Sequence, residues 1–297
     1  LSPKQKVQVV RTLRANGHTV GFLGDGMNDL PAIVESDAGI SVDTAAETVK
    51  EVADVVLLKK DLNVLEEGIK EGHRAFANVS KYIRITASSN FGNIFSIVIA
   101  SAFLPFFPMT ALQILLLNLL YDLLCLVLPW DQVDESICAK PLEWSGKTLG
   151  RFMRFFGPIS SVFDIITFAY LFFVLCPAVC GGTFASLSGS GEQARFIILF
   201  QTGWFLESMW TQVLILHLLR TQKVPLLQSR PSRPVMVVTL LGTAVFTLLT
   251  FTPMGEWIGL TALPPVYFVF LAVTVFFYLL WVTLAKRWYI RHYHELL

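Results

Sequence analysis

The sequence has few charged residues and distributes them unevenly. Of its 297 residues only 15% are charged and 54% are hydrophobic, whereas soluble domains carry about 25% charged residues. Residues 1–84 are rich in charged side chains, and residues 85–285 contain few of them. We therefore expect a soluble segment followed by a membrane domain. The net charge of +1 points to no acidic partner, and we expect no nucleic-acid binding.

Cysteine is scarce, and the first residues lack the features of a leader. Four cysteines are too few for a disulfide framework in a chain of this length. Two of them, Cys176 and Cys180, flank a short Pro-Ala-Val segment, which is compatible with a metal site, a local disulfide or two apolar thiols. The start, Leu1-Ser-Pro-Lys, has no apolar core of the signal-peptide kind. It contains no Met and reads as a helix start, so we expect that an N-terminal portion of a longer chain precedes it.

Residues 3–60 alternate between helical and strand patterns. A first-turn proline followed by apolar residues at helical spacing predicts a helix from Pro3 to the stop signal Asn16-Gly17. Three short apolar runs, with helices between them, predict buried parallel strands of a doubly wound α/β half-domain. Such sheets bind ligands beyond the carboxyl ends of their strands. The predicted strands are Thr19–Leu23, Ala38–Val42 and Ala53–Leu58, and the helix after the first strand is Asn28–Glu35.

The loop after the first predicted strand carries the residues for phosphate chemistry. Gly24 and Gly26 allow the backbone to approach a phosphate closely. The short carboxylate of Asp25 can hold a hard Mg²⁺ ion through oxygen, and Asn28 and Asp29 can orient the metal, its water or a phosphate oxygen. The alternative is an ordinary Asp-Gly turn followed by an Asn cap. The position of the whole string between a strand and a helix favours the phosphate site.

The remaining sequence predicts a stalk helix and six membrane spans. Residues 62–83 place apolar side chains at helical spacing, which predicts an amphipathic helix. A span needs about 20 apolar residues, and the region 84–285 contains six segments of that kind, followed by a tail at 286–297. The predicted spans are 84–104, 111–129, 155–176, 196–219, 235–252 and 265–285.

Basic residues predict the orientation of these spans. If the soluble segment is cytosolic, the loops on the opposite side carry only Arg195. The positive-inside rule then supports a multi-pass protein with both the soluble segment and the C-terminus in the cytosol. The basic loops at 140–154 and 220–233 are also candidate contacts for anionic lipid head groups, although topology explains them equally well. The basic residues of the cytosolic loops and tail are Lys140, Lys147, Arg151, Arg154, Arg220, Lys223, Arg230, Arg233, Lys286, Arg287 and Arg291.

Polar side chains inside the predicted spans are candidate ligands for a transported ion, because burying such groups in lipid is costly. Asn90 and Asn93 lie three residues apart and share a face of the first span, and Asn118 and Asp122 lie four apart on the second. The alternative is a network of hydrogen bonds between helices that only packs the bundle. Asp122 favours the ion site, because a lone buried carboxylate needs a cation or a proton.

Two further acids lie in later predicted spans. Asp164 and Glu207 could each join an ion site, pair structurally or stay protonated. The sequence alone leaves these roles open.

The string GDGMNDLPA at residues 24–32 closely resembles the hinge motif of P-type ATPases, which belong to the haloacid-dehalogenase-like superfamily. The resemblance implies that Asp25 binds the catalytic Mg²⁺ with help from Asp29, and that Asn28 and Asp29 support the phosphate site. Pro3-Lys4-Gln5-Lys6 resembles the family's upstream Pro-x-x-Lys, which implies that Lys6 contacts the phosphoryl group. The alternative for Lys6 is a solvated helix lysine. Leu30 stands where the family usually has Ala.

The membrane part resembles the bacterial magnesium-importing subgroup of this family. The segments 88–93 (SSNFGN), 118–122 (NLLYD) and 207–223 carry this likeness, which extends over essentially the whole chain. Calcium pumps carry Glu in place of Asn93 and Thr in place of Tyr121, and Glu207 matches a position that contributes to the ion site in some of them. A site with one carboxylate and neutral amides suits a partly hydrated Mg²⁺ better than a dry Ca²⁺ cage.

The resemblance implies the C-terminal part of an ATP-driven pump that imports Mg²⁺ through an aspartyl-phosphate cycle in the bacterial inner membrane. Residues 1–61 would be the end of its phosphorylation domain, with ATP as substrate and Mg²⁺ as both cofactor and cargo. The family's Asp-Lys-Thr-Gly string, nucleotide domain, phosphatase-loop domain and first four spans have no counterpart in the sequence. We therefore expect this chain alone to be inactive. The alternatives are a P-type pump for Ca²⁺ or H⁺, and a membrane-anchored phosphatase-like sensor.

Overall fold

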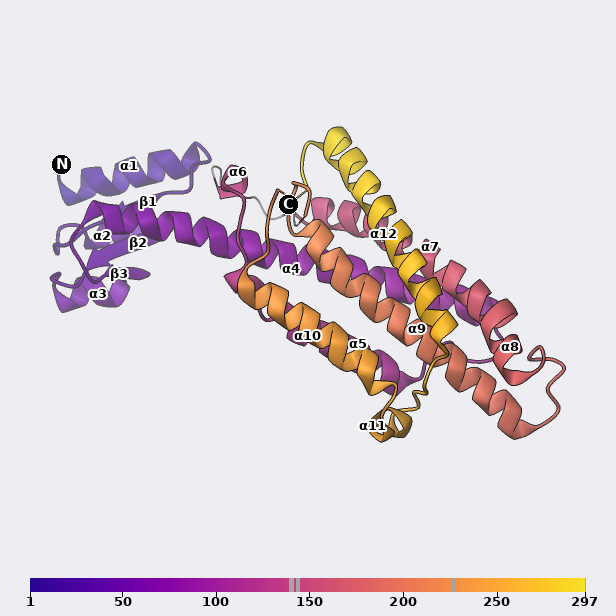
Figure 1. The fold of residues 1–297 in the computed structure, drawn as a ribbon. Coiled ribbons are helices and arrows are strands. Elements are labelled where there is room, and N and C mark those ends of the chain that lie inside the picture. The colour runs from indigo at the N-terminus through magenta and orange to yellow at the C-terminus, as the bar shows by residue number, and fades with distance from the viewer. Residues whose placement is uncertain (139–141, 143–144, 226–227, 297) are drawn as a thin grey trace. The chain divides into compact units, whose positions relative to one another are not determined.

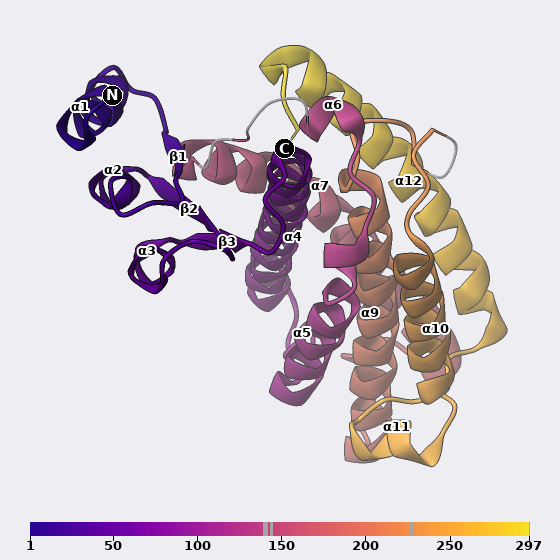
Figure 2. The ribbon, with the colours of Figure 1, turned by 90° about the vertical axis from the view of Figure 1, so that its left-hand side faces the viewer.

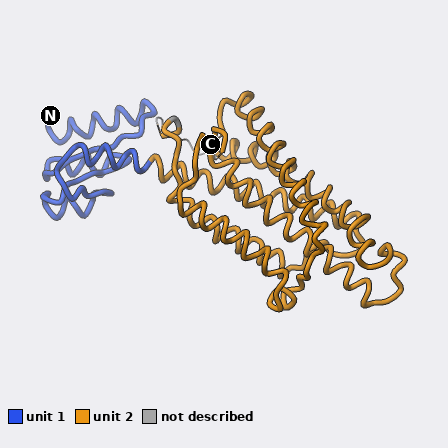
Figure 3. The backbone as a smooth tube through the Cα atoms, in the orientation of Figure 1, with its two compact units in different colours: residues 1–72 blue, residues 73–297 orange. Residues whose placement is uncertain are grey.

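The computed structural model describes residues 1–138, 142, 145–225 and 228–296, so Lys140 of the predicted basic loop lies outside the described residues. The chain divides into two compact units, residues 1–72 and 73–297 (Figure 3). The first is an α/β unit and the second is helical, as the strand and helix patterns and the apolar segments of the sequence predict. The boundary between them falls inside one helix, α4, which runs from Leu62 to Phe103.

The first unit is a three-stranded parallel sheet with helices between the strands. Helices α1, α2 and α3 lie on one side of the three strands (Figure 2), and Val10, Ile33 and Val49 supply their buried contacts. The sequence predicts the order of these elements correctly and makes the first and third strands too long. The elements are α1 (Pro3–Ala15), β1 (Gly21–Leu23), α2 (Leu30–Glu35), β2 (Ala38–Val42), α3 (Glu47–Val52) and β3 (Val55–Leu57).

The order of the strands places their carboxyl ends along one edge. The sheet has the order β1-β2-β3, with Leu23 opposite Ile40 and Val42 opposite Leu57. Because the strands are parallel, the loops that follow Leu23, Val42 and Leu57 emerge at the same edge. This edge is where the sequence predicts the phosphate loop.

The second unit is a bundle of long helices joined by short helical segments (Figure 1). A 3₁₀ turn at Leu128–Trp130 follows α5, and a π-helical turn at Leu171–Leu175 joins α7 to α8. Besides the continuation of α4, the helices are α5 (Ala111–Cys125), α6 (Glu135–Cys138), α7 (Gly146–Tyr170), α8 (Cys176–Cys180), α9 (Ser190–Leu219), α10 (Arg233–Leu249), α11 (Pro253–Trp257) and α12 (Pro265–Tyr293).

Four helical segments in the described part of the chain are long and apolar enough to cross a membrane. They begin at Leu62, Ala111, Gly146 and Pro265, and α10 is a shorter apolar helix. Helix α9 has 30 residues but carries polar side chains along its length, including Gln201, Glu207 and Gln212. The membrane character that the sequence predicts is therefore present, and the number of spans stays a prediction.

Helix α9 forms the centre of the bundle. It packs against α5, α7, α10 and α12, and side chains on all its sides are buried, among them Phe200, Trp204 and Leu216. A helix that is buried all round belongs to the interior of a large protein or bundle. This position explains how α9 accommodates polar groups, because they contact other helices.

A buried charge cluster joins α4 to α9. The carboxylate of Asp131 accepts hydrogen bonds from Lys81 Nζ at 3.1 Å and from Arg220 Nη1 at 3.0 and 3.1 Å. All three side chains are fully buried. We call Lys81, Asp131 and Arg220 the Asp131 cluster.

The segment that contains Asp131 also binds α4 through its main chain. Asn78 Nδ2 donates to the carbonyl oxygens of Pro129 and Asp131, both at 3.1 Å, and Lys81 Nζ donates to that of Gln132 at 3.0 Å. Ala77, on the same face of α4, packs against Ile137. The connection between α5 and α7 is thus fixed to α4 over several residues.

Helices α4 and α7 touch backbone to backbone at two glycines. A Cβ atom on Gly92 would lie 2.9 Å from the carbonyl oxygen of Gly157, and one on Gly157 would lie 2.6 Å from the ring of Phe91. Ser161 Oγ adds a hydrogen bond of 3.0 Å to the carbonyl oxygen of Gly92. Small residues permit this close approach between helices in membranes.

Replacing Gly157 with leucine is expected to destabilise the bundle, because the new side chain has no space against Gly92. Overpacking of this kind costs about 1–3 kcal/mol. The thermal midpoint of the full-length protein in detergent measures the loss. Gly150→Leu is the matched control on the same helix, since a Cβ there meets nothing within 4 Å. Equal midpoints for the two variants would contradict the prediction.

Candidate functional site

The phosphate loop begins where β1 ends, and its glycine is required by a close contact. Gly24 N donates to the carbonyl oxygen of Ile40 at 3.0 Å, which continues the sheet by one bond. A Cβ on Gly24 would lie 2.5 Å from the Cβ of Asp29. The loop therefore folds back so that Asp29, at the start of α2, lies against Gly24, and any larger residue at Gly24 would displace it.

The carboxylate of Asp25 lies at the carboxyl edge of the sheet and is half exposed. It forms an ion pair of 2.5 Å with Lys60 Nζ, and 51% of its side chain is accessible. The hydrogen bond and the charge of this ammonium lower the pKa of the Asp25 carboxyl. Asp25 is therefore an accessible anion, available to a cation from solution.

Lys6 and Asp29 form the second ion pair of the loop. Lys6 Nζ lies 2.5 Å from Asp29 Oδ1, and both side chains are largely shielded from water. This contact brings the lysine of α1 to the loop and shields much of its side chain from water.

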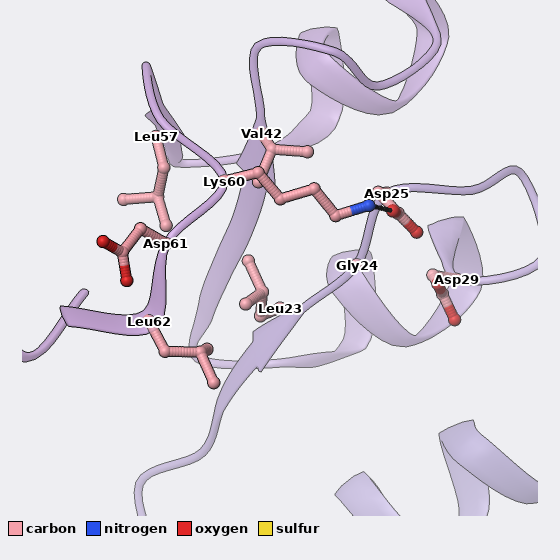
Figure 4. A pocket seen from close by; sticks show the side chains of 9 residues that line it. All are labelled: Leu23, Gly24, Asp25, Asp29, Val42, Leu57, Lys60, Asp61 and Leu62. Carbon is pink, nitrogen blue, oxygen red and sulfur yellow. Dashed lines mark hydrogen bonds and ion pairs between the residues drawn. The ribbon is translucent and has the colours of Figure 1, made fainter. Parts of the chain in front are cut away.

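A cavity of about 360 Å³ lies next to these groups (Figure 4). Leu23, Val42 and Leu57, the last residues of the three strands, form part of its lining, together with Asp25 and Asp29. Its position agrees with the general rule for open parallel sheets. Asn28 is exposed and is not among the residues that line the cavity.

The chemistry of the loop fits a bound Mg²⁺ ion. The available donors are carboxylate oxygens, which Mg²⁺ prefers, and this ion commonly takes only one or two of them and keeps its water. Within the described ranges, no three His, Cys, Asp or Glu side chains form a metal-binding group. A site of this kind would therefore hold the metal through Asp25 and Asp29, with water and phosphate as the other ligands.

A second cavity lies in the helical unit and collects three of the predicted ion ligands. It has a volume of about 210 Å³ and is lined by Asn90 and Asn93 from α4, Asn118 from α5 and Trp204 from α9, among others. The helical spacing predicted that each pair shares a face. The structure places Asn90, Asn93 and Asn118 in the lining of one cavity, but Asp122, the other member of the second pair, does not line it.

The two predicted acidic ligands lie outside the lining of this cavity. Asp122 is exposed on α5. Glu207 is fully buried on α9, and its two carboxylate oxygens have no hydrogen-bond partner among the described residues. Asp164 is buried on α7 and accepts hydrogen bonds from Ser96 and Trp204.

Sequence reasoning did not identify three of these contributors. Lys60 follows the third strand as Asp25 follows the first, so the rule about carboxyl ends could have found it. Trp204 and Ser96 gave no signal, because a tryptophan and a serine in an apolar helix are ordinary packing residues. Cys176 and Cys180 are free thiols on α8.

The family models match both units of the chain. Residues 6–69 match the haloacid dehalogenase-like hydrolases, and residues 106–288 match the C-terminal region of cation-transporting ATPases. The chain belongs to the P-type cation-transporting ATPases. The resemblance drawn from residues 24–32 is thereby confirmed.

The similar proteins of this family include magnesium transporters. The magnesium-transporting ATPase, P-type 1, of Salmonella typhimurium strain LT2 is 47% identical over 99% of this chain, and that of Escherichia coli K12 is 45% identical over 99%. The calcium-transporting ATPase of Bacillus subtilis is 34% identical over 48% of the chain. The chain spans 31% of the length of the two magnesium transporters.

Proposed function

We propose that this chain is the C-terminal part of an ATP-driven pump that moves Mg²⁺ across the membrane, in the importing direction, by an aspartyl-phosphate cycle. The observation that carries the proposal is the cavity lined by the three asparagines in the helical unit. Neutral amide oxygens suit an ion that keeps part of its hydration shell, as Mg²⁺ does. The high identity to magnesium-transporting relatives over 99% of the chain supports the same ion.

The α/β unit would supply part of the phosphoryl-transfer site of this pump. Asp25 and Asp29 would hold the catalytic Mg²⁺, which neutralises charge on the transferred phosphoryl group when it is bound. Lys6, held by its ion pair with Asp29, would add a positive charge to the phosphate pocket. Gly24 and Gly26 would let the backbone approach the phosphate of ATP or of the aspartyl-phosphate, and Asn28 would orient a phosphate oxygen. Positioning and electrostatic stabilisation of this kind are what phosphoryl transfer requires.

The helical unit would supply part of the transport site. Asn90, Asn93 and Asn118 line the cavity, and Asp122 lies one helical turn beyond Asn118. An exposed carboxylate in the middle of a span is costly against lipid, so we infer that the remaining portion of the full-length protein covers Asp122. Glu207, on α9, would be the second acidic ligand of the transported ion.

The rest of the pump would follow the predicted plan. Residues 1–61 would complete a phosphorylation domain with strands from the preceding portion, 62–83 would form the stalk, and 84–285 would form six spans, followed by the tail 286–297. The basic loops and the C-terminus would face the cytosol of a bacterial inner membrane, in contact with anionic lipid head groups.

The test is the ATPase activity of the full-length protein against free Mg²⁺, Ca²⁺ and pH, with Mg·ATP kept sufficient for catalysis. Wild-type activity should follow free Mg²⁺. Asp122→Asn removes one charged ligand, and a hydrogen bond to a charged group is worth about 1.5–3 kcal/mol, so we expect half-activation at a free Mg²⁺ concentration roughly 10–100-fold higher.

Glu256→Gln serves as the control, because this acid lies on α11 outside the proposed site. Activity that follows Ca²⁺ or protons instead would move the ion assignment to another pump of the family. An Asp122→Asn variant with unchanged response to Mg²⁺ would remove this residue from the transport site.

A further inference from the structure

Trp204 belongs to the asparagine-lined cavity and to a buried hydrogen bond at the same time. Its side chain is 1% exposed and lines the cavity with Asn90, Asn93 and Asn118. Its Nε1 donates a hydrogen bond of 2.8 Å to Oδ1 of Asp164. The orientation of this ring, and with it one wall of the cavity, is therefore fixed from the side of Asp164.

The other oxygen of Asp164 binds the helix that carries the asparagines. Ser96 Oγ donates to Asp164 Oδ2 at 2.6 Å. Ser96 lies three residues after Asn93, so both are on one face of α4. A single carboxylate of α7 thus holds the wall on α9 and the asparagine face on α4.

No basic residue lies close to Asp164 along α7, or in the parts of the neighbouring helices that surround it. The segments 85–130, 155–194 and 196–216 contain no Lys, Arg or His, and the other acid on the adjoining turn of α9 is Glu207. A carboxyl group in this setting is stabilised by a cation or by a proton, because no basic side chain of these segments neutralises it.

We propose that Asp164 is a positioning residue of the cation site, which sets the affinity for the transported ion by fixing Trp204 and Ser96 on either side of the cavity. This inference rests on the proposed pump function and assigns a role to residues that the ligand set above does not include. Asp164 acts through the indole of Trp204 and through α4.

The test uses the full-length protein and the cation that stimulates its wild-type ATPase. Trp204→Phe keeps an aromatic ring and removes the N–H donor, and Asp164→Leu removes the acceptor. Each is expected to raise the cation concentration for half-activation about 5–10-fold, with the maximal rate within about twofold of wild type. The double variant should equal Asp164→Leu, because Asp164→Leu already removes the hydrogen bond from Trp204 and also the one from Ser96. Asp164→Asn keeps an acceptor for the indole and should lie closer to wild type than Asp164→Leu.

The matched control is Trp210→Phe on the same helix. Trp210 Nε1 donates to Thr247 of α10 at 3.1 Å, and the residue is outside the cavity lining. Its loss should leave half-activation unchanged. Equal shifts for Trp204→Phe and Trp210→Phe, or additive shifts in the double variant, would overturn the proposal.

Two further results decide the remaining cases. If Asp164→Leu does not fold, Ser96→Ala can replace it, because it removes only one buried hydroxyl. Ser96→Ala should raise the cation concentration for half-activation about twofold to threefold. Wild-type values for both Ser96→Ala and Trp204→Phe would refute the role of Asp164. A wild type that responds to Ca²⁺ or protons would overturn the ion assignment alone, because the variants are then titrated with that ion.

Discussion

Replacement of Asp25 by alanine in the full-length protein is expected to reduce the steady-state ATPase rate by about 100–1000-fold, because Asp25 would hold the Mg²⁺ that stabilises developing charge, and losing one such stabilising group usually costs this much. Asp25 is accessible, anionic and placed at the carboxyl edge of the sheet, next to the 360 Å³ cavity. Asp29 lines the same cavity, but its side chain is only 15% exposed, compared with 51% for Asp25.

Asp61→Ala is the matched control for this variant. Asp61 lines the same cavity, but its carboxylate points away from Asp25 and Lys60 (Figure 4). We expect Asp61→Ala to keep most of the activity. The rates are compared at saturating Mg·ATP, with the folded fraction of each variant measured by size-exclusion chromatography. Comparable losses in both variants, or a fully active Asp25→Ala, would exclude Asp25 from phosphoryl transfer.

Replacement of Asp131 by asparagine is expected to destabilise the helical unit by about 3–5 kcal/mol, because Lys81 and Arg220 then remain buried without the carboxylate that pairs with both of them. The side chains of all three members of the Asp131 cluster are fully buried. Thermal unfolding in detergent can be followed with a dye that reacts with thiols as they become exposed, since Cys125 and Cys176 are buried.

Two comparisons separate this effect from a general loss of charge. Glu66→Gln breaks an exposed pair with Lys70 on α4, at 2.6 Å, and exposed pairs of this spacing contribute only about 0.3–0.5 kcal/mol. The triple variant Asp131→Leu, Lys81→Met, Arg220→Met should recover most of the loss, because an apolar replacement of a buried ion pair is often neutral. A small effect of Asp131→Asn, similar to that of Glu66→Gln, would show that water reaches the cluster.

Local sequence patterns predict the elements of the α/β unit well. Pro3, Asn16-Gly17 and the apolar runs are signals that act over a few residues, and the structure has α1, β1, β2 and β3 where they predict them. The ends of the strands do not follow from local patterns, because Thr19 and Leu58 are compatible with a strand but their pairing depends on neighbours elsewhere in the chain. In the helical unit, the apolar segments predicted at 196–219 and 235–252 fall on α9 and α10, but the burial of α9 on all its sides depends on its central position, which local patterns do not reveal.

The candidate site also combines features that local patterns reveal with features that depend on the folded chain. Residues within one loop or one helix face could be grouped from the sequence: Asp25 and Asp29 both line the first cavity, and Asn90 and Asn93 both line the second. Helical spacing could not tell that Asn118 faces the cavity while Asp122, one turn further, is exposed. The partners of Asp25 and Asp164 come from residues 35 and more positions away, and only the folded chain brings such residues together.

The hydrogen bonds between α4 and the segment after α5 determine which positions of that segment tolerate substitution. Asn78 and Lys81 bind the carbonyl oxygens of Pro129, Asp131 and Gln132, which every amino acid possesses, and the side chain of Gln132 is exposed. Substitutions at Gln132 therefore leave these bonds intact, whereas Asp131 is constrained by its own carboxylate. A saturation mutagenesis scan selected for growth would then show a tolerant position directly beside an intolerant one.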